Sequence, residues 1–266
     1  MKNLVKAEIR RLLATRVPGG LLLAAVLSGA GLFGAMALVG PENFDPPMPG
    51  LDTGAGIRGL LGLLGYTAFV PAAVGALAVT SEHRHRTAAV TFLFEPRRGR
   101  VLAAKLVTYG AAGLAYGLVL AGTAAGALFA VAAVRGISLG LPAATVLALL
   151  ARIGLAMVVY LLLGVGVGAL LRNQVTALCV VIGYLYLGEP LLLMIPGVNA
   201  LYPVLPGGAT AALTDFTYLA DAISDEVGGT AVRLLSPAAG ALLLAGYALA
   251  AALIAVVLPM RRDVTL

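Results

Sequence analysis

The sequence predicts an all-α, polytopic membrane protein that crosses the bilayer six times and forms a single domain, residues 1–266. Hydrophobic residues make up 61% of the chain and charged residues only 11%, which is more apolar than a water-soluble domain requires. Long apolar runs alternate with short charged stretches, and each helical crossing needs roughly 20 apolar residues. Basic residues gather in every second connection, as the positive-inside rule requires.

The apolar runs set the expected spans, at about residues 17–40, 57–80, 106–134, 143–171, 175–195 and 237–258. The connection over residues 41–56 carries four prolines and is predicted to be an irregular loop. Glu189-Pro190 interrupts the fifth run, because proline cannot donate the backbone hydrogen bond of a continuous helix. A long polar segment, residues 196–236, precedes the sixth run.

Ahead of the first run, the segment from Lys2 to Arg16 intersperses leucine and isoleucine with five basic residues. This pattern is typical of an amphipathic helix that lies on an anionic membrane surface and does not cross it. We therefore expect an N-terminal interfacial helix in contact with membrane lipid.

Orientation follows from the basic residues, because Lys and Arg resist translocation whereas acidic residues matter little. Alternation of the six crossings puts the N-terminal segment, the connection from Ser81 to Lys105, Arg172 and the tail with Arg261 and Arg262 on one side. We expect that side to be the cytoplasm of a bacterial cell, with both termini inside. The opposite connections collect the acidic residues Glu42, Asp45, Asp52, Asp215, Asp221, Asp225 and Glu226.

The connection from Ser81 to Lys105 is the most basic one and is longer than a turn needs. We expect it to hold a short helix along the cytoplasmic surface, ended by a proline, which docks in a groove of a soluble partner and passes motion to the flanking spans. Charge that only sets topology is the alternative interpretation. The candidate coupling residues are Glu82, Arg84, Arg86, Thr87, Pro96, Arg97, Arg98 and Lys105.

Two charges fall inside the expected spans, Arg152 in the fourth and Glu189 in the fifth. An unpaired charge in hydrocarbon costs at least a few kcal/mol, so the two are predicted to pair or to line a polar path. A purely structural ion pair is the alternative hypothesis.

No motif predicts catalysis, a cofactor or a metal in this chain. There is no Walker motif, and Gly164-Val-Gly-Val-Gly168 lies within an apolar run without a following lysine. His83 and His85 are two residues apart and would point to different faces of a helix. Gly113 with Gly117, and Gly122 with Gly126, have the spacing of close helix packing.

The net charge of +6 is distributed between apolar runs and forms no separate basic domain, so a nucleic-acid partner is not expected. Membrane orientation accounts for these charges better than binding to DNA or RNA does.

Several segments together resemble a known family. They are SEHRHRT at 81–87, EPRRGRVLAAK at 95–105, LLRNQVTAL at 170–178, GEPLLL at 188–193 and YPVLPGGATAAL at 202–213. In this order and with six spans, the chain resembles the permease subunits of ABC exporters of the type 2 family over essentially its whole length.

The resemblance implies a permease dimer, a homodimer or a heterodimer, that binds separately encoded ABC ATPase subunits, which hold the ATP and magnesium. It also implies that Ser81 to Lys105 is a coupling helix and that short re-entrant or interfacial helices lie between Pro196 and Ser236 on the outer side. The family positions carried over are Glu82, Thr87, Pro96, Arg97 and Lys105.

From this resemblance we expect ATP-driven export of a hydrophobic or amphipathic compound, such as a drug, an antibiotic or a peptide, with no enzymatic activity in the chain itself. A membrane-embedded transferase or protease is the enzyme alternative, but no intramembrane catalytic set is visible. A non-pumping membrane immunity or assembly factor that binds a peptide or lipid is the second alternative.

Overall fold

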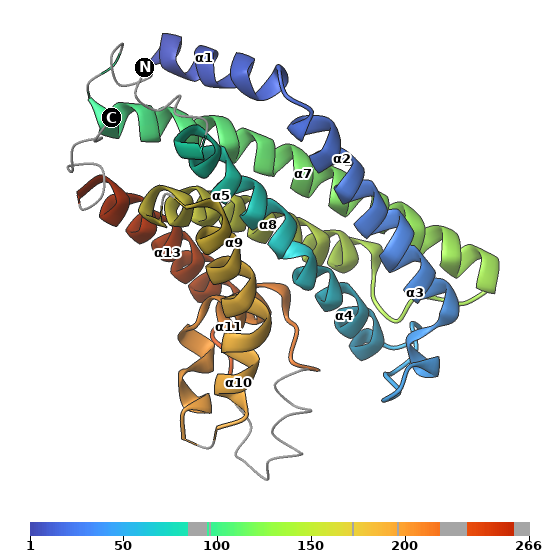
Figure 1. Cartoon of the computed structure of the whole chain (residues 1–266). Helices are drawn as coiled ribbons and strands as arrows, with labels where there is room; N and C mark the ends of the chain where they lie inside the picture. Colours follow the sequence, from blue (N-terminus) through green and yellow to red (C-terminus); the bar gives the residue numbers. More distant parts are fainter. Residues whose placement is uncertain (85–94, 96, 172, 196, 219–232, 258–266) are drawn as a thin grey trace.

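The computed structural model is a bundle of long helices (Figure 1), described for residues 1–84, 95, 97–171, 173–195, 197–218 and 233–257. Over these ranges there is no β-strand. Six helical segments in the described ranges are long and apolar enough to cross a membrane: Val17–Val39, Gly54–Glu82, Gly99–Arg135, Ala143–Leu171, Gln174–Leu193 and Pro237–Ala255. The predicted six-span, all-α architecture is confirmed at this level.

The first two membrane-length segments are composite rods. α2 (Val17–Val26), a π-helical stretch (Leu27–Phe33) and α3 (Gly34–Val39) form the first, preceded by the amphipathic helix α1 (Lys2–Leu13). α4 (Gly54–Leu63), a 3-10 stretch (Leu64–Ala68) and α5 (Phe69–Arg84) form the second. Thr53 caps α4 by accepting a hydrogen bond from Gly56 N at 3.0 Å.

The third helix, α7 (Arg98–Arg135), begins eight residues before the expected span at residue 106. At 1.5 Å per residue its 38 residues extend about 57 Å, nearly twice the thickness of a bilayer's hydrocarbon core. Its charged first turns therefore continue the helix beyond the apolar part. A hydropathy pattern marks only the apolar part of such a helix, so the expected span begins later in the sequence than the helix does.

The remaining helices complete the bundle. α8 spans Ala143–Leu171, and the fifth segment consists of α9 (Gln174–Gly183), a π-helical stretch (Tyr184–Gly188) and α10 (Glu189–Leu193). A 3-10 stretch (Asn199–Val204) and α11 (Pro206–Thr214) follow, and α13 is Pro237–Val257. The expected break at Glu189-Pro190 is present as the π-helical stretch that ends just before it.

α8 is the central helix, because it packs against α5, α7 and α13. Gly117 of α7 and Gly154 of α8 allow the closest approach, since a Cβ on Gly117 would lie 2.5 Å from the Gly154 carbonyl oxygen. Gly168 meets Ala76 of α5 in the same way. Glycines thus let backbones touch where lipid provides no hydrophobic drive.

The glycine predictions hold in part. Gly113 faces the backbone of Val158, so the Gly113/Gly117 pair packs on α8, whereas the space around Gly122 and Gly126 is open. The glycines of the 164–168 segment lie within α8 and pack on α5 and α13, which agrees with rejecting a phosphate loop there.

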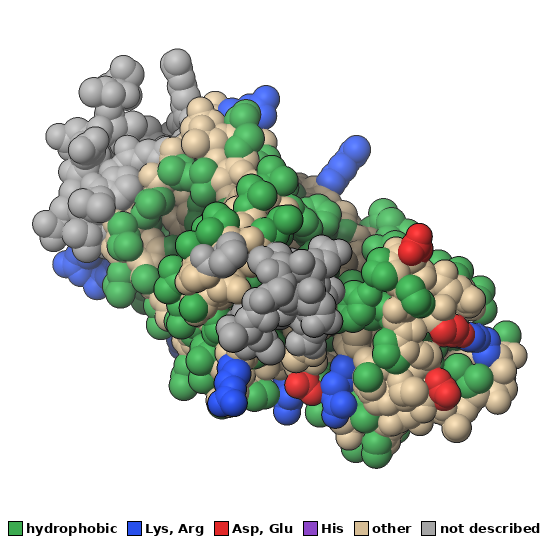
Figure 2. Space-filling model, turned by 90° about the horizontal axis from the view of Figure 1, so that it is seen from below, with side chains coloured by type: hydrophobic (Ala, Val, Ile, Leu, Met, Phe, Trp, Pro, Cys, Tyr) green, Lys and Arg blue, Asp and Glu red, His purple; other side chains and the backbone are tan. Residues whose placement is uncertain are grey.

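The sequence predicts a polar segment after α10, but α11 within this segment is buried. Eight of its nine residues are buried, and it packs against α13 and α8. In Figure 1 α10 and α11 lie together at the lower end of the bundle, away from α1. Hydrophobic side chains cover much of the face that Figure 2 shows, and charged side chains on that face are few.

Candidate functional site

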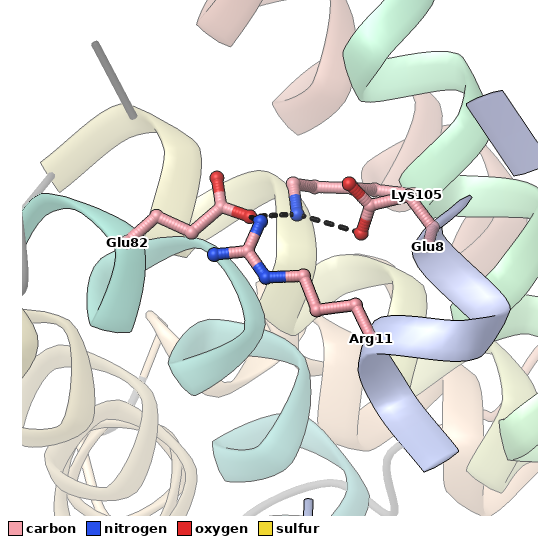
Figure 3. A network of polar contacts seen from close by, with 4 residues as sticks. All are labelled: Glu8, Arg11, Glu82 and Lys105. Carbon is pink, nitrogen blue, oxygen red and sulfur yellow. Dashed lines mark hydrogen bonds and ion pairs between the residues drawn. The ribbon is translucent and has the colours of Figure 1, made fainter. Parts of the chain in front are cut away.

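Four charged side chains from three helices meet where α5 ends and α7 begins (Figure 3). Lys105 Nζ of α7 lies 2.9 Å from Glu8 Oε2 of α1 and also binds Glu82 of α5. Arg11 of α1 binds the same Glu82 carboxylate. We call these four residues the charge cluster, and the end of the bundle that holds it the α1 end.

The charge cluster is largely removed from solvent. The side chains of Glu8, Glu82 and Lys105 are at most 9% exposed, while Arg11 is 40% exposed. Two carboxylates, one ammonium and one guanidinium balance in charge, and this pairing offsets the cost of burying the charges. The cluster therefore fixes α1, α5 and α7 relative to one another.

These contacts lie at both ends of the predicted coupling connection. Glu82 is two residues before the end of α5, and Lys105 is on the third turn of α7. Arg84, the last residue of α5, is exposed and donates a hydrogen bond to Gln174 Oε1 at 3.1 Å. Arg97 is also exposed and precedes α7, which begins at Arg98.

The other predicted coupling residues, Arg86, Thr87 and Pro96, lie outside the described residues, as does the side chain of Arg98. The structure thus brings two of the eight candidates together, Glu82 with Lys105, and leaves Arg84 and Arg97 at the surface. The expectation of a short helix between them falls on residues that the structure does not describe.

Sequence reasoning missed Glu8 and treated Arg11 only as part of a basic face. Glu8 is the only buried residue of α1, and it stands between the half-buried Leu4 and Leu12 at helical spacing. A lone acid on the apolar face of an amphipathic helix is the signal that could have found it, because such an acid needs a cationic partner from another helix.

The second candidate site surrounds Glu189, the first residue of α10, which is 2% exposed. Its Oε2 accepts a hydrogen bond from Gly207 N, in the first turn of α11, at 2.6 Å. A carboxylate at this position also interacts favourably with the positive end of the helix dipole. Glu189 thereby links α10 to α11.

Two tyrosine hydroxyls help to fix α11 and the stretch before it. Tyr160 of α8 lies 2.8 Å from Thr210 Oγ1, and its hydroxyl lies 3.2 Å from the Pro206 carbonyl oxygen. Tyr247 of α13 donates to the Val204 carbonyl at 2.7 Å. Burial raises the pKa of Tyr202, in the 3-10 stretch, so its hydroxyl stays neutral.

Arg152 and Glu189 do not form an ion pair in the part of the chain that the structure describes. Arg152 is half-buried on α8, and Glu189 instead caps α11. The predicted pairing is therefore not seen in this conformation, and the alternative of a polar path remains a prediction.

Exposed ion pairs occupy the end of the bundle opposite the α1 end, which we call the far end. Arg58 of α4 lies 2.7 Å from Asp215, which follows α11, and Arg135 at the end of α7 binds Glu42. The hydrogen bond from Arg135, together with a bond to its own backbone, lowers the pKa of Glu42. These partners are 25–48% exposed.

Comparison with known proteins adds no family assignment, since no family model and no curated protein matches the chain.

Proposed function

We propose that this chain is the membrane-spanning permease subunit of an ATP-driven ABC exporter. It would move a hydrophobic or amphipathic compound, such as a drug, an antibiotic or a peptide, out of a bacterial cell. ATP and magnesium would be bound by a separate ATPase subunit, so the chain itself is a transport subunit and not an enzyme.

The charge cluster is the main structural support for this proposal. It joins both ends of the basic connection, which runs from Ser81 to Lys105, to an amphipathic helix on the same side of the bundle. A displacement applied to this connection would reach α5 and α7 directly and α1 through the cluster, because a paired buried charge resists separation. Such an arrangement suits a segment that transmits force from a partner.

The candidate coupling residues divide into two roles. Arg84 and Arg97 are exposed and available to contact an ATPase. Glu82 and Lys105 are buried within the cluster and would act by positioning the connection. Arg86, Thr87, Pro96 and Arg98 belong to the same basic segment.

The proposed topology puts the α1 end and both termini in the cytoplasm, because the basic connections gather there. Two permease chains would form the transport path. The 3-10 stretch and α11 would be the short outer re-entrant helices, which is supported by the burial of α11 and by its place at the far end. Cysteines introduced at Arg97 and Asp45 test the topology: only the first should be protected from an impermeant thiol reagent in intact cells.

Copurification tests the partner. The chain extracted from its native membrane in a mild detergent should retain an ATPase that carries a Walker motif. Arg97→Glu should reduce the amount of bound ATPase without changing the thermal stability of the chain, because Arg97 is exposed and its side chain makes no described contact. Arg16→Glu is the matched control, since Arg16 is also exposed and lies between α1 and α2, outside the connection from Ser81 to Lys105 in the sequence.

Absence of any ATPase from the purified complex would contradict the exporter proposal and favour the alternative, a non-pumping immunity or assembly factor. Equal loss of ATPase in Arg97→Glu and Arg16→Glu would show that general surface charge, and not the connection, attracts the partner.

A further inference from the structure

Aromatic and small side chains surround Glu189 in a cavity of about 70 Å³. The cavity lies in the half of the bundle nearer the far end, which we call the far half. A second cavity of about 240 Å³ adjoins it, and the two share Tyr160 and Leu185 as lining residues. The smaller cavity lies between the second membrane-length segment, α10 and α11, and the larger between α8, α13 and the fifth segment. Together they offer room for one small organic molecule.

The two oxygens of the Glu189 carboxyl group differ in their contacts. Oε2 accepts the bond from Gly207 N, whereas Oε1 is buried and accepts no hydrogen bond of normal geometry from the described residues. The Tyr184 side chain lies near enough to interact with this carboxyl group. A tyrosine hydroxyl carries no positive charge, so a carboxylate at Glu189 has no cation to compensate the cost of its burial.

No described cationic side chain meets this need. The residues that line the two cavities include no Lys, Arg or His, and Arg58 of α4 binds Asp215. In the charge cluster, by contrast, each buried carboxylate has a cation within the protein. A cationic ligand would supply the positive charge that the described residues do not place at Glu189.

The walls of the smaller cavity suit a cation with an apolar body. Tyr66, Tyr160, Tyr186, Tyr202 and Phe216 line it, and Tyr66 packs edge-on against Phe216 with ring centroids 6.2 Å apart. The faces of such rings attract ammonium groups, and the ring bodies bury hydrocarbon. A buried carboxylate and several aromatic rings form a recognised combination for an organic cation.

We propose that Glu189 anchors the cationic group of a small amphipathic ligand, an ammonium attached to an aromatic or aliphatic body, in this cavity. The ammonium donates a hydrogen bond to Oε1, and the apolar body extends past Tyr160 and Leu185 into the larger cavity. That this ligand is the transported compound rests on the proposed function, whereas the binding itself does not. Glu189 remains the cap of α11 with or without the ligand.

A pair of probes tests the site. The full chain in lipid nanodiscs is titrated with 4-phenylbutylammonium and, separately, with 4-phenylbutan-1-ol, its neutral counterpart of similar shape. The chain has no tryptophan and nine tyrosines, so its intrinsic emission reports on tyrosine, and four of the nine line the smaller cavity. Empty nanodiscs correct for partitioning of the probes into lipid.

The wild type should bind the ammonium probe more tightly than the alcohol. Glu189→Gln should weaken ammonium binding at least about tenfold, as expected for the loss of a charged hydrogen bond, and should leave alcohol binding unchanged. Asp45→Asn is the control, because it removes an exposed acid outside both cavities and should affect neither probe.

Equal affinity of the wild type for the two probes, no binding of either, or unchanged ammonium affinity in Glu189→Gln would each overturn the proposal. Copurification of the ATPase is measured in the same preparations. An ATPase that copurifies while ammonium binding does not depend on Glu189 refutes this site alone. Binding that depends on Glu189 without an ATPase refutes the exporter proposal alone.

Discussion

Glu82 at the α1 end and Glu189 in the far half are both buried carboxyl residues, 5% and 2% exposed, yet their surroundings differ. Glu82 binds Lys105 and Arg11, two cations supplied by other helices. Glu189 receives one backbone hydrogen bond and interacts with Tyr184, and no described cation binds it. The charge of Glu82 is compensated by cations of the protein itself, whereas Glu189 can accept a hydrogen bond from a further, positively charged partner.

The difference indicates that the two ends of the bundle are built for different tasks. Buried and paired charges fix helices in one arrangement, whereas a buried acid without a cation keeps a binding capacity at some cost in stability. The α1 end is therefore suited to transmitting movement and the far half to holding a ligand.

Lys105→Met should give the largest loss of stability. It leaves Glu8 and Glu82 close together without the ammonium that lies between them, and removing one partner of a buried pair costs about 3–5 kcal/mol. Unfolding by a denaturing detergent, followed by circular dichroism in mixed micelles, measures the change. Lys6→Met is the control, since Lys6 is exposed on the same α1 surface helix. Similar stability of the two variants would contradict a structural role for the charge cluster.

The same substitution at the two buried glutamates should have different effects. Glu82→Gln removes a charge that two cations compensate and should cost about 1–3 kcal/mol. Glu189→Gln retains an acceptor for Gly207 N and removes a charge without a described cation, so stability should be unchanged or slightly raised. Parallel unfolding titrations at pH 7 provide the comparison. A larger loss in Glu189→Gln than in Glu82→Gln would show that the far half already contains the missing cation.

Much of the architecture could be predicted from hydropathy and charge. Six apolar runs correspond to six membrane-length helical segments in the described part of the chain, and Glu189-Pro190 marked the break in the fifth. α7 begins before the expected span, because its first turns are helical but charged. The burial of α11 was missed because its composition of Gly, Ala and Thr resembles that of a polar loop. Its burial depends on packing against α13 and α8, which no local pattern reveals.

The sequence identified individual residues of the candidate sites but not the contacts between them. Glu82 and Lys105 were chosen for their place in a basic connection, yet their pairing depends on α1, whose contribution of Glu8 comes from 97 residues before Lys105. Arg152 and Glu189 were matched by depth alone, and the structure does not pair them. Depth in a membrane fixes one coordinate, whereas a contact also requires that two helix faces turn toward each other.

The smallest effect is expected at the exposed pair of Glu42 and Arg135. Surface ion pairs contribute less than about 1 kcal/mol, so Glu42→Gln should lower stability slightly at pH 7. Because the pKa of Glu42 lies below its ordinary value of 4.5 in the folded chain, this contribution is fully present above that value and is lost as the pH falls through the lowered pKa. The difference between wild type and Glu42→Gln should therefore vanish in acid, and high salt should also reduce it by screening.

Asp45→Asn, at an exposed acid of the same loop, supplies the control in the same unfolding titrations. A Glu42→Gln effect as large as that of Lys105→Met, or one that persists in acid, would mean that the far end is held by charge as firmly as the α1 end, and the contrast between them would be lost.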